Sequence, residues 1–195
     1  MDNFQVYSDE ALMVQVMDHH SHAAIMELHK RYSRKLLGYF IRMLQKDENL
    51  AQDFVQEIFL RILEKKHSFD PSKKFYTWLF TIASNMCKTA YRRSPFKSLS
   101  HENKVFSKHL QFADDLAEKN HFNALLEKCI DELEHGQKTV FILRYNEHFS
   151  LQEIADITEI SIGTVKSRLF YATQKMAIHL KEFDPRYESQ LFKLS

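Results

Sequence analysis

The sequence predicts an all-α protein built from two small helical domains that are joined by a flexible linker. The chain has 195 residues but only three Gly and three Pro, too few for the many turns of a β-sandwich or a barrel. Apolar residues make up 44% of the sequence, which is enough to build packed cores rather than a disordered chain. They recur at intervals of three and four residues, which is the period of amphipathic helices.

Residues 1–93 form the expected first domain. The apolar period predicts four helices in it, over residues 11–19, 23–44, 50–66 and 75–93. Asp70 and Pro71 predict a turn before the last of these helices. The second helix has a regular apolar stripe, formed by Ile25, Leu28, Tyr32, Leu36, Tyr39, Phe40 and Met43.

The composition changes after residue 93. Residues 94–120 contain Pro95, several serines and scattered charges without a sustained helical period, so we expect a flexible linker there. Residues 182–195 are expected to be a frayed tail. The helical period returns in the expected second domain, residues 121–181, with predicted helices over 122–133, 137–145, 151–157 and 162–180.

Basic residues are segregated along the chain, although the formal net charge is only +1. Residues 71–101 contain six basic residues and no acid, and residues 161–181 contain four basic residues and no acid. Two separate cationic stretches fit two contacts with a polyanion such as a nucleic acid. Charge alone fits a solvated surface equally well. The motifs within these stretches are therefore needed to distinguish nucleic-acid binding from an ordinary solvated surface.

A helix-turn-helix is predicted in the second domain. Ser150 and Glu153 have the spacing of a capping box, which predicts that a helix starts at Leu151. Ala155 is small enough for a second helix to approach closely, and Ser161 is a suitable N-cap for that second helix. Two short helices that meet across three or four residues have the geometry of a DNA-binding helix-turn-helix. The alternative for the same pattern is a purely structural helical hairpin.

The second of these helices carries polar and basic residues near its N-terminal end, which is the end that enters a major groove. Arg and Lys side chains can bind guanine edges there, and Ser and Thr side chains can reach bases or phosphates. The candidate DNA-binding residues of this domain are therefore Ser161, Thr164, Lys166, Ser167 and Arg168.

The segment DFVQEIFLRIL, residues 53–63, predicts an amphipathic helix in the first domain. Asp53, Gln56 and Glu57 stand on its polar face. Spacing alone would place that face in solvent. The opposite face is expected to be one broad apolar stripe, formed by Phe54, Val55, Ile58, Phe59, Ile62 and Leu63.

Residues 69–85, FDPSKKFYTWLFTIASN, combine aromatic side chains with a polar residue and are followed by cations. Aromatic rings that stack on a base, a polar side chain that hydrogen-bonds it and nearby cations suit the binding of an unpaired base and its phosphates. A core position is the alternative for Phe75, Trp78 and Phe80, and Trp78 is expected to lie mainly in the core. The candidate nucleic-acid-binding residues of the first domain are Phe69, Lys73, Lys74, Phe75, Asn85, Lys88, Arg92 and Arg93.

Three of these segments resemble RNA polymerase sigma factors of the sigma-70 family. EIADITEISIGTVKSRLFYA, residues 153–172, looks like the family's promoter-reading motif, which runs EIA-x-x-L-G-I-S-x-G-T-V-K-S-R-L. DFVQEIFLRIL is similar to the helix that binds the clamp of the polymerase core. Residues 69–85 resemble the pattern F-x5-F-x-T-W-L-x-x-I-A-x-N. Because no large regulatory domain is recognisable, the compact extracytoplasmic-function type fits best.

The resemblance implies a role for each group of candidate residues. Asp53, Gln56 and Glu57 would bind the clamp of the largest polymerase subunit. The first domain would bind and open the minus-ten promoter element, and the second would read the minus-thirty-five element, while the flap is a further implied contact of the core polymerase. The implied function is promoter-directed transcription initiation for a stress- or signal-responsive gene set. The implied partners are core polymerase, promoter DNA and, as a hypothesis, an anti-sigma factor, with no catalytic residue, metal or cofactor.

Three positions depart from the family's pattern. Thr158 and Glu159 stand in the turn where Leu and Gly are usual, and Tyr171 replaces a frequent Arg, which removes one expected phosphate contact. A Gly in this turn relieves a left-handed backbone conformation. We therefore expect Glu159 to adopt that conformation at a cost in stability.

Two other classes of protein remain as alternatives. One is an ordinary transcription regulator with an N-terminal sensor, although a sensor does not need the two motifs of the first domain. The other is a metalloenzyme that uses the histidine cluster His19, His20 and His22, although no acid or Cys stands at clear ligand spacing.

The remaining sequence signals predict a cytoplasmic protein without membrane insertion. The N-terminal residues are polar and show no signal peptide, and the longest apolar run, Leu36–Ile41, is too short to span a membrane. Cys87 and Cys129 form no CxxC motif and lie among apolar neighbours. We expect both to be reduced core residues.

Overall fold

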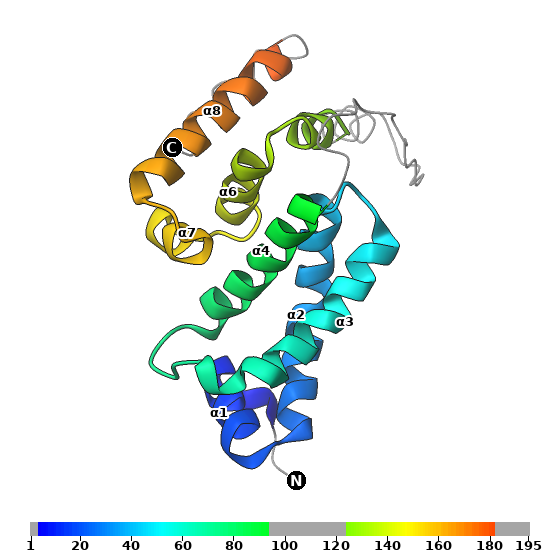
Figure 1. Ribbon diagram of the computed structural model, residues 1–195, viewed down its shortest axis with the longest axis vertical. Helices are drawn as coiled ribbons and strands as arrows, with labels where there is room; N and C mark the ends of the chain where they lie inside the picture. The colour runs from blue at the N-terminus through cyan, green and yellow to red at the C-terminus, as the bar shows by residue number, and fades with distance from the viewer. Residues whose placement is uncertain (1–3, 94–123, 182–195) are drawn as a thin grey trace.

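The computed structural model describes residues 4–93 and 124–181, and within these ranges every regular element is a helix (Figure 1). This confirms the predicted all-α class. The expected linker, residues 94–120, and the expected tail, residues 182–195, lie outside the described residues. Among the helices of the described ranges, none is long and apolar enough to cross a membrane.

The first domain contains all four predicted helices, each within a few residues of its expected bounds. α1 begins two residues early because Ser8 caps it, accepting a hydrogen bond from the Ala11 N–H at 3.1 Å. Asp47 caps α3 in the same way. The elements are η1 (Phe4–Val6), α1 (Asp9–His19), α2 (His22–Met43), α3 (Glu48–Lys65), η2 (Lys66–Ser68) and α4 (Phe75–Arg93).

The apolar stripe of α2 forms the centre of the first domain, as its spacing predicts. All seven side chains of the stripe are at most 8% exposed. Tyr39 packs edge-on against Phe80 of α4 at 5.2 Å between ring centroids, and Phe40 packs against Phe54 of α3 at 5.4 Å. Buried aromatic side chains contribute about 1.5–3 kcal/mol each, so this contact of three helices stabilises the bundle.

The second domain contains the predicted helix-turn-helix, formed by α7 and α8, and two helices that precede it. Residues 124–131 are helical and precede α6 (His135–Tyr145), α7 (Leu151–Thr158) and α8 (Ile162–Lys181). The capping box is present, because the Glu153 N–H donates to Ser150 Oγ at 3.2 Å and the Ser150 N–H donates to Glu153 Oε2 at 2.9 Å. The inner faces of α7 and α8 are buried through Ile154, Val165 and Leu169.

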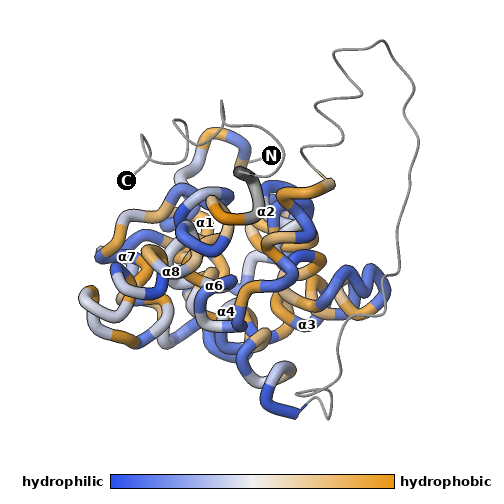
Figure 2. The backbone as a smooth tube through the Cα atoms, turned by 90° about the horizontal axis from the view of Figure 1, so that it is seen from above, coloured by the Kyte–Doolittle hydropathy of each residue, from blue (hydrophilic) through white to orange (hydrophobic). Residues whose placement is uncertain are grey.

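The two domains pack against each other through α4. In Figures 1 and 2, α4 lies between α3 of its own domain and the helices of the second domain. The ring of Phe149, which is 3% exposed, stacks on Tyr76 at 4.8 Å and meets Phe80 at 5.3 Å. The Tyr76 hydroxyl also donates to Glu147 at 2.7 Å. The second domain, which was expected to be separate, therefore makes an apolar contact with the first domain.

A second set of contacts between the domains is ionic. Arg42, in the last turn of α2, pairs with Glu127 at 3.5 Å, and Lys46, which follows the helix, pairs with Asp131 at 2.8 Å. Asp131 also binds the buried Lys138 of α6 at 2.7 Å. Burial acts to raise the pKa of Asp131, but the two lysines outweigh it and hold the pKa below its ordinary value. Asp131 therefore forms ion pairs with one lysine from each domain.

The turn between α7 and α8 contains the expected left-handed residue. Glu159 has φ 56° and ψ 39° and forms the C-cap of α7. This conformation costs a non-Gly residue about 1–2 kcal/mol, whereas Gly adds about 0.4–1 kcal/mol of conformational entropy to the unfolded chain. The strain therefore exceeds the entropy by roughly 0.5 kcal/mol.

We predict that Glu159→Gly raises the melting temperature by about 1–2 °C, as expected for this free energy in a chain of this size. Differential scanning calorimetry measures the change. The control is Glu159→Ala, which removes the carboxylate but keeps the strained Cβ, and it should give no increase. A lower melting temperature for Glu159→Gly would show that the left-handed strain does not dominate.

Candidate nucleic-acid and polymerase interfaces

The loop between η2 and α4 is held at both ends by buried aromatic rings. Phe69 is 3% exposed and Phe75 is fully buried, and their ring centroids lie 5.9 Å apart. Trp78 packs against both rings and is partly buried, in line with its expected core role. The prediction that Phe69 and Phe75 contact DNA directly does not fit this burial. We correct it: these two rings anchor the loop.

The tip of the loop, residues 70–74, is exposed and compact. Asp70 organises it by accepting hydrogen bonds from the Ser72 N–H at 3.0 Å and the Ser72 hydroxyl at 2.8 Å. These bonds from Ser72 hold the pKa of Asp70 below its ordinary value. The Lys73 N–H closes the turn on the Asp70 carbonyl at 2.9 Å. The tip thus presents Lys73 and Lys74 to solvent on a fixed backbone.

Lys74 already has a partner in the second domain. Its ammonium group lies 2.8 Å from Glu153 Oε1, and its side chain remains 75% exposed. Glu153 is the same residue that closes the capping box of α7. Its hydrogen bonds, with that from Lys74 the largest effect and those from Ser150 next, lower the pKa of Glu153 to about 2. A phosphate that approaches Lys74 therefore competes with this carboxylate for the ammonium group.

A polar and cationic face continues along α4 beyond the loop. Asn85, Lys88 and Arg92 are exposed and follow one another at three- and four-residue spacing, so they share one face of the helix. Arg93 is exposed at the end of the helix. The side of α4 that carries Tyr76 and Phe80 is covered by the second domain. The exposed candidates of the first domain thus lie at the loop tip and along α4, with Asn85, Lys88 and Arg92 on one face of that helix.

In the second domain, Ser161 and Thr164 shape the start of α8. The Thr164 N–H donates to Ser161 Oγ at 3.1 Å, and the two hydroxyl oxygens lie 2.8 Å apart. Ser161 is therefore the helix cap that the sequence predicts. Lys166 and Ser167 are exposed one turn later, and the Ser167 hydroxyl donates to the Thr164 carbonyl at 3.0 Å.

Arg168 lies on a different side of α8 from Lys166. It is partly buried, and its guanidinium group packs over Gly136 of α6 so closely that a Cβ at Gly136 would lie 3.0 Å from Arg168 Cζ. His135, beside this contact, stacks on Tyr91 of α4 at 4.3 Å. Burial, followed by the nearby cations Lys138, Arg168 and Lys88, lowers the pKa of His135 to about 4.

Two aromatic residues on α8 are candidates that the sequence reasoning missed. Phe170 and Tyr171 are 60% and 57% exposed, and their ring centroids lie 5.5 Å apart. Phe170 stands four residues after Lys166, on the same face of the helix. That spacing could have identified it, because apolar side chains can contact thymine methyl groups in a major groove.

The polar face of α3 is exposed as predicted, but it also carries leucines. Asp53 and Gln56 are exposed, and Glu57 is paired with Arg61 at 2.6 Å on the same helix. Leu60 is 61% exposed next to this group. Leu63, which was expected in the buried stripe, is 42% exposed, because its position turns it away from the contact with α2. The other five residues of the stripe are buried or pack against the core.

The histidine cluster does not form a metal site in the described part of the chain. There, no group of three or more His, Cys, Asp or Glu residues is arranged to hold a metal ion. His19 ends α1 and His20 follows it as a left-handed cap. Cys87 and Cys129 are both buried free thiols, and burial raises the pKa of each.

Comparisons with known proteins agree with the motifs. The family model Sigma-70 region 2 matches residues 28–95, and Sigma-70, region 4 matches residues 123–176. The ECF RNA polymerase sigma-E factor of Haemophilus influenzae is 32% identical over 178 residues, which cover 86% of this chain and 92% of the relative. The RNA polymerase sigma-H factor of Pseudomonas aeruginosa is 29% identical over 154 residues, covering 74% and 79%.

Two solved structures share the fold. CnrH in complex with the cytosolic domain of CnrY has a TM-score of 0.67 and 23% identity, covering 90% of this chain and 99% of that one. The sigma factor RpoE in complex with the anti-sigma factor NepR, from Bartonella quintana, has a TM-score of 0.60 and 24% identity, covering 78% and 93%. Both family models match this chain, and a sigma-E factor is similar to it over most of its length. The chain therefore belongs to the extracytoplasmic-function sigma factors of the sigma-70 family, which direct RNA polymerase to promoters for transcription initiation.

Proposed function

We propose that this protein binds core RNA polymerase through α3 and contacts promoter DNA through two separate surfaces. Residues 1–93 would bind and open the minus-ten element, and residues 121–181 would read the minus-thirty-five element. The observation that carries the proposal is that α4 and α8, one in each family match, both present polar and cationic residues to solvent. The protein would act in the cytoplasm by binding alone, since sigma factors are not known as enzymes.

The proposed polymerase surface on α3 combines charge with apolar area. Asp53, Gln56 and Glu57 surround the exposed Leu60. An exposed leucine framed by polar side chains is typical of an interface centre with a polar rim. The clamp of the largest polymerase subunit is the proposed partner of this surface, and the second domain would contact the flap.

We predict that Asp53→Lys combined with Glu57→Lys weakens binding to core polymerase at least tenfold, because like charges at an interface cost several kcal/mol. The helix should persist, since a repulsive pair four residues apart costs only about 0.2–0.5 kcal/mol. Asp18→Lys combined with Glu134→Lys makes the same charge change at two other exposed acids and is the control. Unchanged co-purification with the core would exclude the α3 surface.

The proposed minus-ten surface joins the loop tip to the exposed face of α4. Lys73, Lys88 and Arg92 would hold phosphates, while Asn85 would contact an unpaired base or its backbone. Phe69 and Phe75 would keep the loop in place from within the core. Lys74 would join the surface in competition with its ion pair to Glu153.

We predict different effects for Asn85→Ala and Lys88→Ala. Asn85→Ala should leave the closed complex intact but lower the yield of open complex, measured by permanganate reactivity of thymines. Lys88→Ala should weaken binding to all promoters alike. It should also reduce the slope of log affinity against log salt concentration by about one. Asn49→Ala, at an exposed site on α3, is the control for both variants. Normal thymine reactivity in Asn85→Ala would leave Asn85 with a structural role only.

The proposed minus-thirty-five surface is the exposed face of α8. Lys166, Ser167 and Phe170 stand on it in this structure, whereas Arg168 packs on Gly136. We therefore place Lys166 ahead of Arg168 as the base-reading cation, with Ser161 and Thr164 fixing the end of the helix that enters the groove.

We predict that Lys166→Ala costs about 1–3 kcal/mol of affinity for a promoter duplex and relaxes the preference at one base pair. Arg168→Ala should change affinity less and leave every base preference intact. Electrophoretic mobility shifts on duplexes with single base-pair changes measure both effects. The opposite result would mean that Arg168 leaves Gly136 and reads the base.

An anti-sigma factor is a further proposed partner. The related RpoE was solved with the anti-sigma factor NepR, and a protein of that class would be expected to compete with core polymerase for exposed apolar surface. The exposed leucines of α3 are suitable for such a contact.

A further inference from the structure

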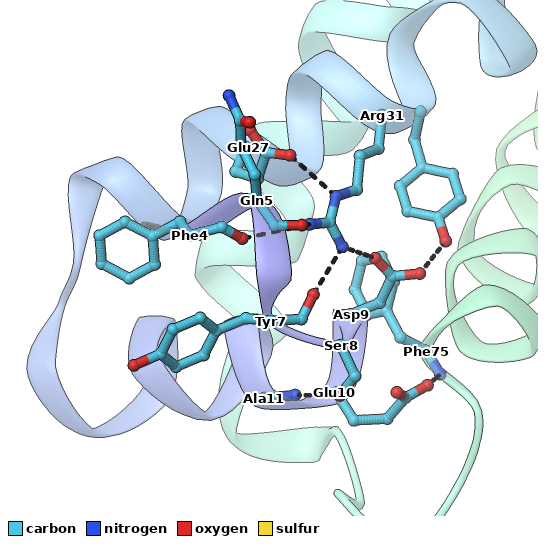
Figure 3. Close-up of polar contacts among 11 residues, drawn as sticks. Phe4, Gln5, Tyr7, Ser8, Asp9, Glu10, Ala11, Glu27, Arg31 and Phe75 are labelled. Carbon is cyan, nitrogen blue, oxygen red and sulfur yellow. Dashed lines mark hydrogen bonds and ion pairs between the residues drawn. The ribbon is translucent and has the colours of Figure 1, made fainter. Parts of the chain in front are cut away.

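The first residues of the chain are connected to the proposed minus-ten loop, although they precede the Sigma-70 region 2 match, which begins at residue 28. Figure 3 shows the contacts that link η1 and the start of α1 to α2 and to the first residue of α4. Two side chains carry this arrangement, Arg31 of α2 and Glu10 of α1.

Arg31 holds the N-terminal segment against α2 through main-chain and carboxylate oxygens. Its guanidinium group donates to the carbonyls of Phe4 at 3.1 Å, Gln5 at 3.1 Å and Tyr7 at 2.9 Å. It also binds Asp9 at 2.7 Å and Glu27 at 2.9 Å. A planar fork with five donors suits such a cluster of acceptors, so one side chain fixes the path of the chain into α1 (Figure 3).

The first turn of α1 is fixed further by its own polar residues. The Tyr32 hydroxyl donates to the second oxygen of Asp9, and Ser8 caps the helix. Asp9 therefore binds two residues of α2 that are one position apart in the sequence. Glu10, the next residue, is held in place by this anchored turn.

Glu10 caps a different helix from its own. Its Oε1 accepts a hydrogen bond from the Phe75 N–H at 3.0 Å, and Phe75 is the first residue of α4. The first N–H groups of a helix have no partner within it and need an outside acceptor. The residue before α4 is Lys74, whose side chain has donors only. Lys74 cannot supply the acceptor, and α1 supplies it through Glu10.

The electrostatics agree with this geometry. Burial acts to raise the pKa of Glu10, but hydrogen bonds from the Phe75 N–H, its own N–H and Ser8 outweigh burial and lower the pKa. The carboxylate stands in the first turn of α1 and at the start of α4, and both helix ends favour negative charge. It is therefore ionised at neutral pH and available as an acceptor.

We infer that Glu10 is a positioning residue for capture of the unpaired minus-ten strand, because it fixes the end of the loop that α4 shares with the tip residues 70–74. The inference rests on the proposed function of that loop. Phe69 and Phe75 hold the two ends of the loop through their rings, and Glu10 holds one end through the backbone. Without the Glu10 carboxylate, the Phe75 N–H must find another acceptor. The start of α4 then shifts, and Lys73 and Lys74 shift with it.

The test uses the full-length protein bound to core polymerase. The probe is a fluorescent single-stranded oligonucleotide with the non-template minus-ten segment of a promoter that this holoenzyme transcribes, together with copies that have one abasic position. Glu10→Ala should weaken binding of the intact strand roughly tenfold, because a hydrogen bond to a charged group is lost from the loop. It should also bring the affinities for intact and abasic strands together. Affinity for a minus-thirty-five duplex and for the core should stay unchanged.

Three further variants make the result specific. Glu10→Gln keeps an acceptor for the Phe75 N–H and should recover most of the discrimination between intact and abasic strands. Asp18→Ala, at an exposed acid on the same helix, should behave like the unchanged protein. Lys73→Ala tests the loop itself and should weaken binding of the strand.

The readout separates positioning from stability. A smaller folded fraction lowers the affinities for the intact and the abasic strand equally, so their ratio stays unchanged. Suppose that Lys73→Ala weakens strand binding but Glu10→Ala leaves the ratio of the affinities for intact and abasic strands unchanged. The positioning role of Glu10 is then wrong, and the proposed loop function stands. If neither variant changes strand binding, the loop is not the minus-ten site, and the inference falls with it.

Discussion

The packing of α4 between the two domains is the contact on which the rest of the structure depends. One side of this helix supplies Phe80 to the core of the first domain, where it meets Tyr39. The same region receives Phe149 of the second domain through Tyr76 and Phe80. Only the remaining face, with Asn85 and the cations after it, is left to solvent. The direction in which α4 presents its polar residues is thus set by two apolar contacts.

The proposed binding surfaces share one design, in which exposed polar groups stand on a backbone fixed from below. In the minus-ten loop, buried rings and the Glu10 carboxylate hold the ends while the lysines remain exposed. At the start of α8, Ser161 caps the helix while Lys166 is exposed one turn later. Groups that are held in place before binding lose less entropy when a ligand arrives. The rigid parts are apolar or hydrogen-bonded, and the binding parts are cationic.

The sequence predicted the features that depend on near neighbours. The capping box of Ser150 and Glu153 and the left-handed Glu159 follow from residues within a few positions. The contacts of Lys74 with Glu153 and of Glu10 with Phe75 could not be predicted, because they join residues 79 and 65 positions apart. The burial of Phe69 was missed for a related reason, because the helical period ends before the loop and only the packed structure shows which way its ring turns. Phe75 opens α4, where a core position was the open alternative.

The contact between the domains has a thermodynamic consequence for promoter affinity. In the proposed function the two domains bind two separate promoter elements, whereas in this structure Lys74 of the first domain and Glu153 of the second lie 2.8 Å apart. If binding both elements requires this contact to break, the apparent dissociation constant for two-element binding equals the intrinsic one divided by the fraction of molecules in which the contact is open. Every 1.4 kcal/mol that stabilises the closed form therefore weakens two-element binding about tenfold, and a partner that favours the open form restores it by the same factor.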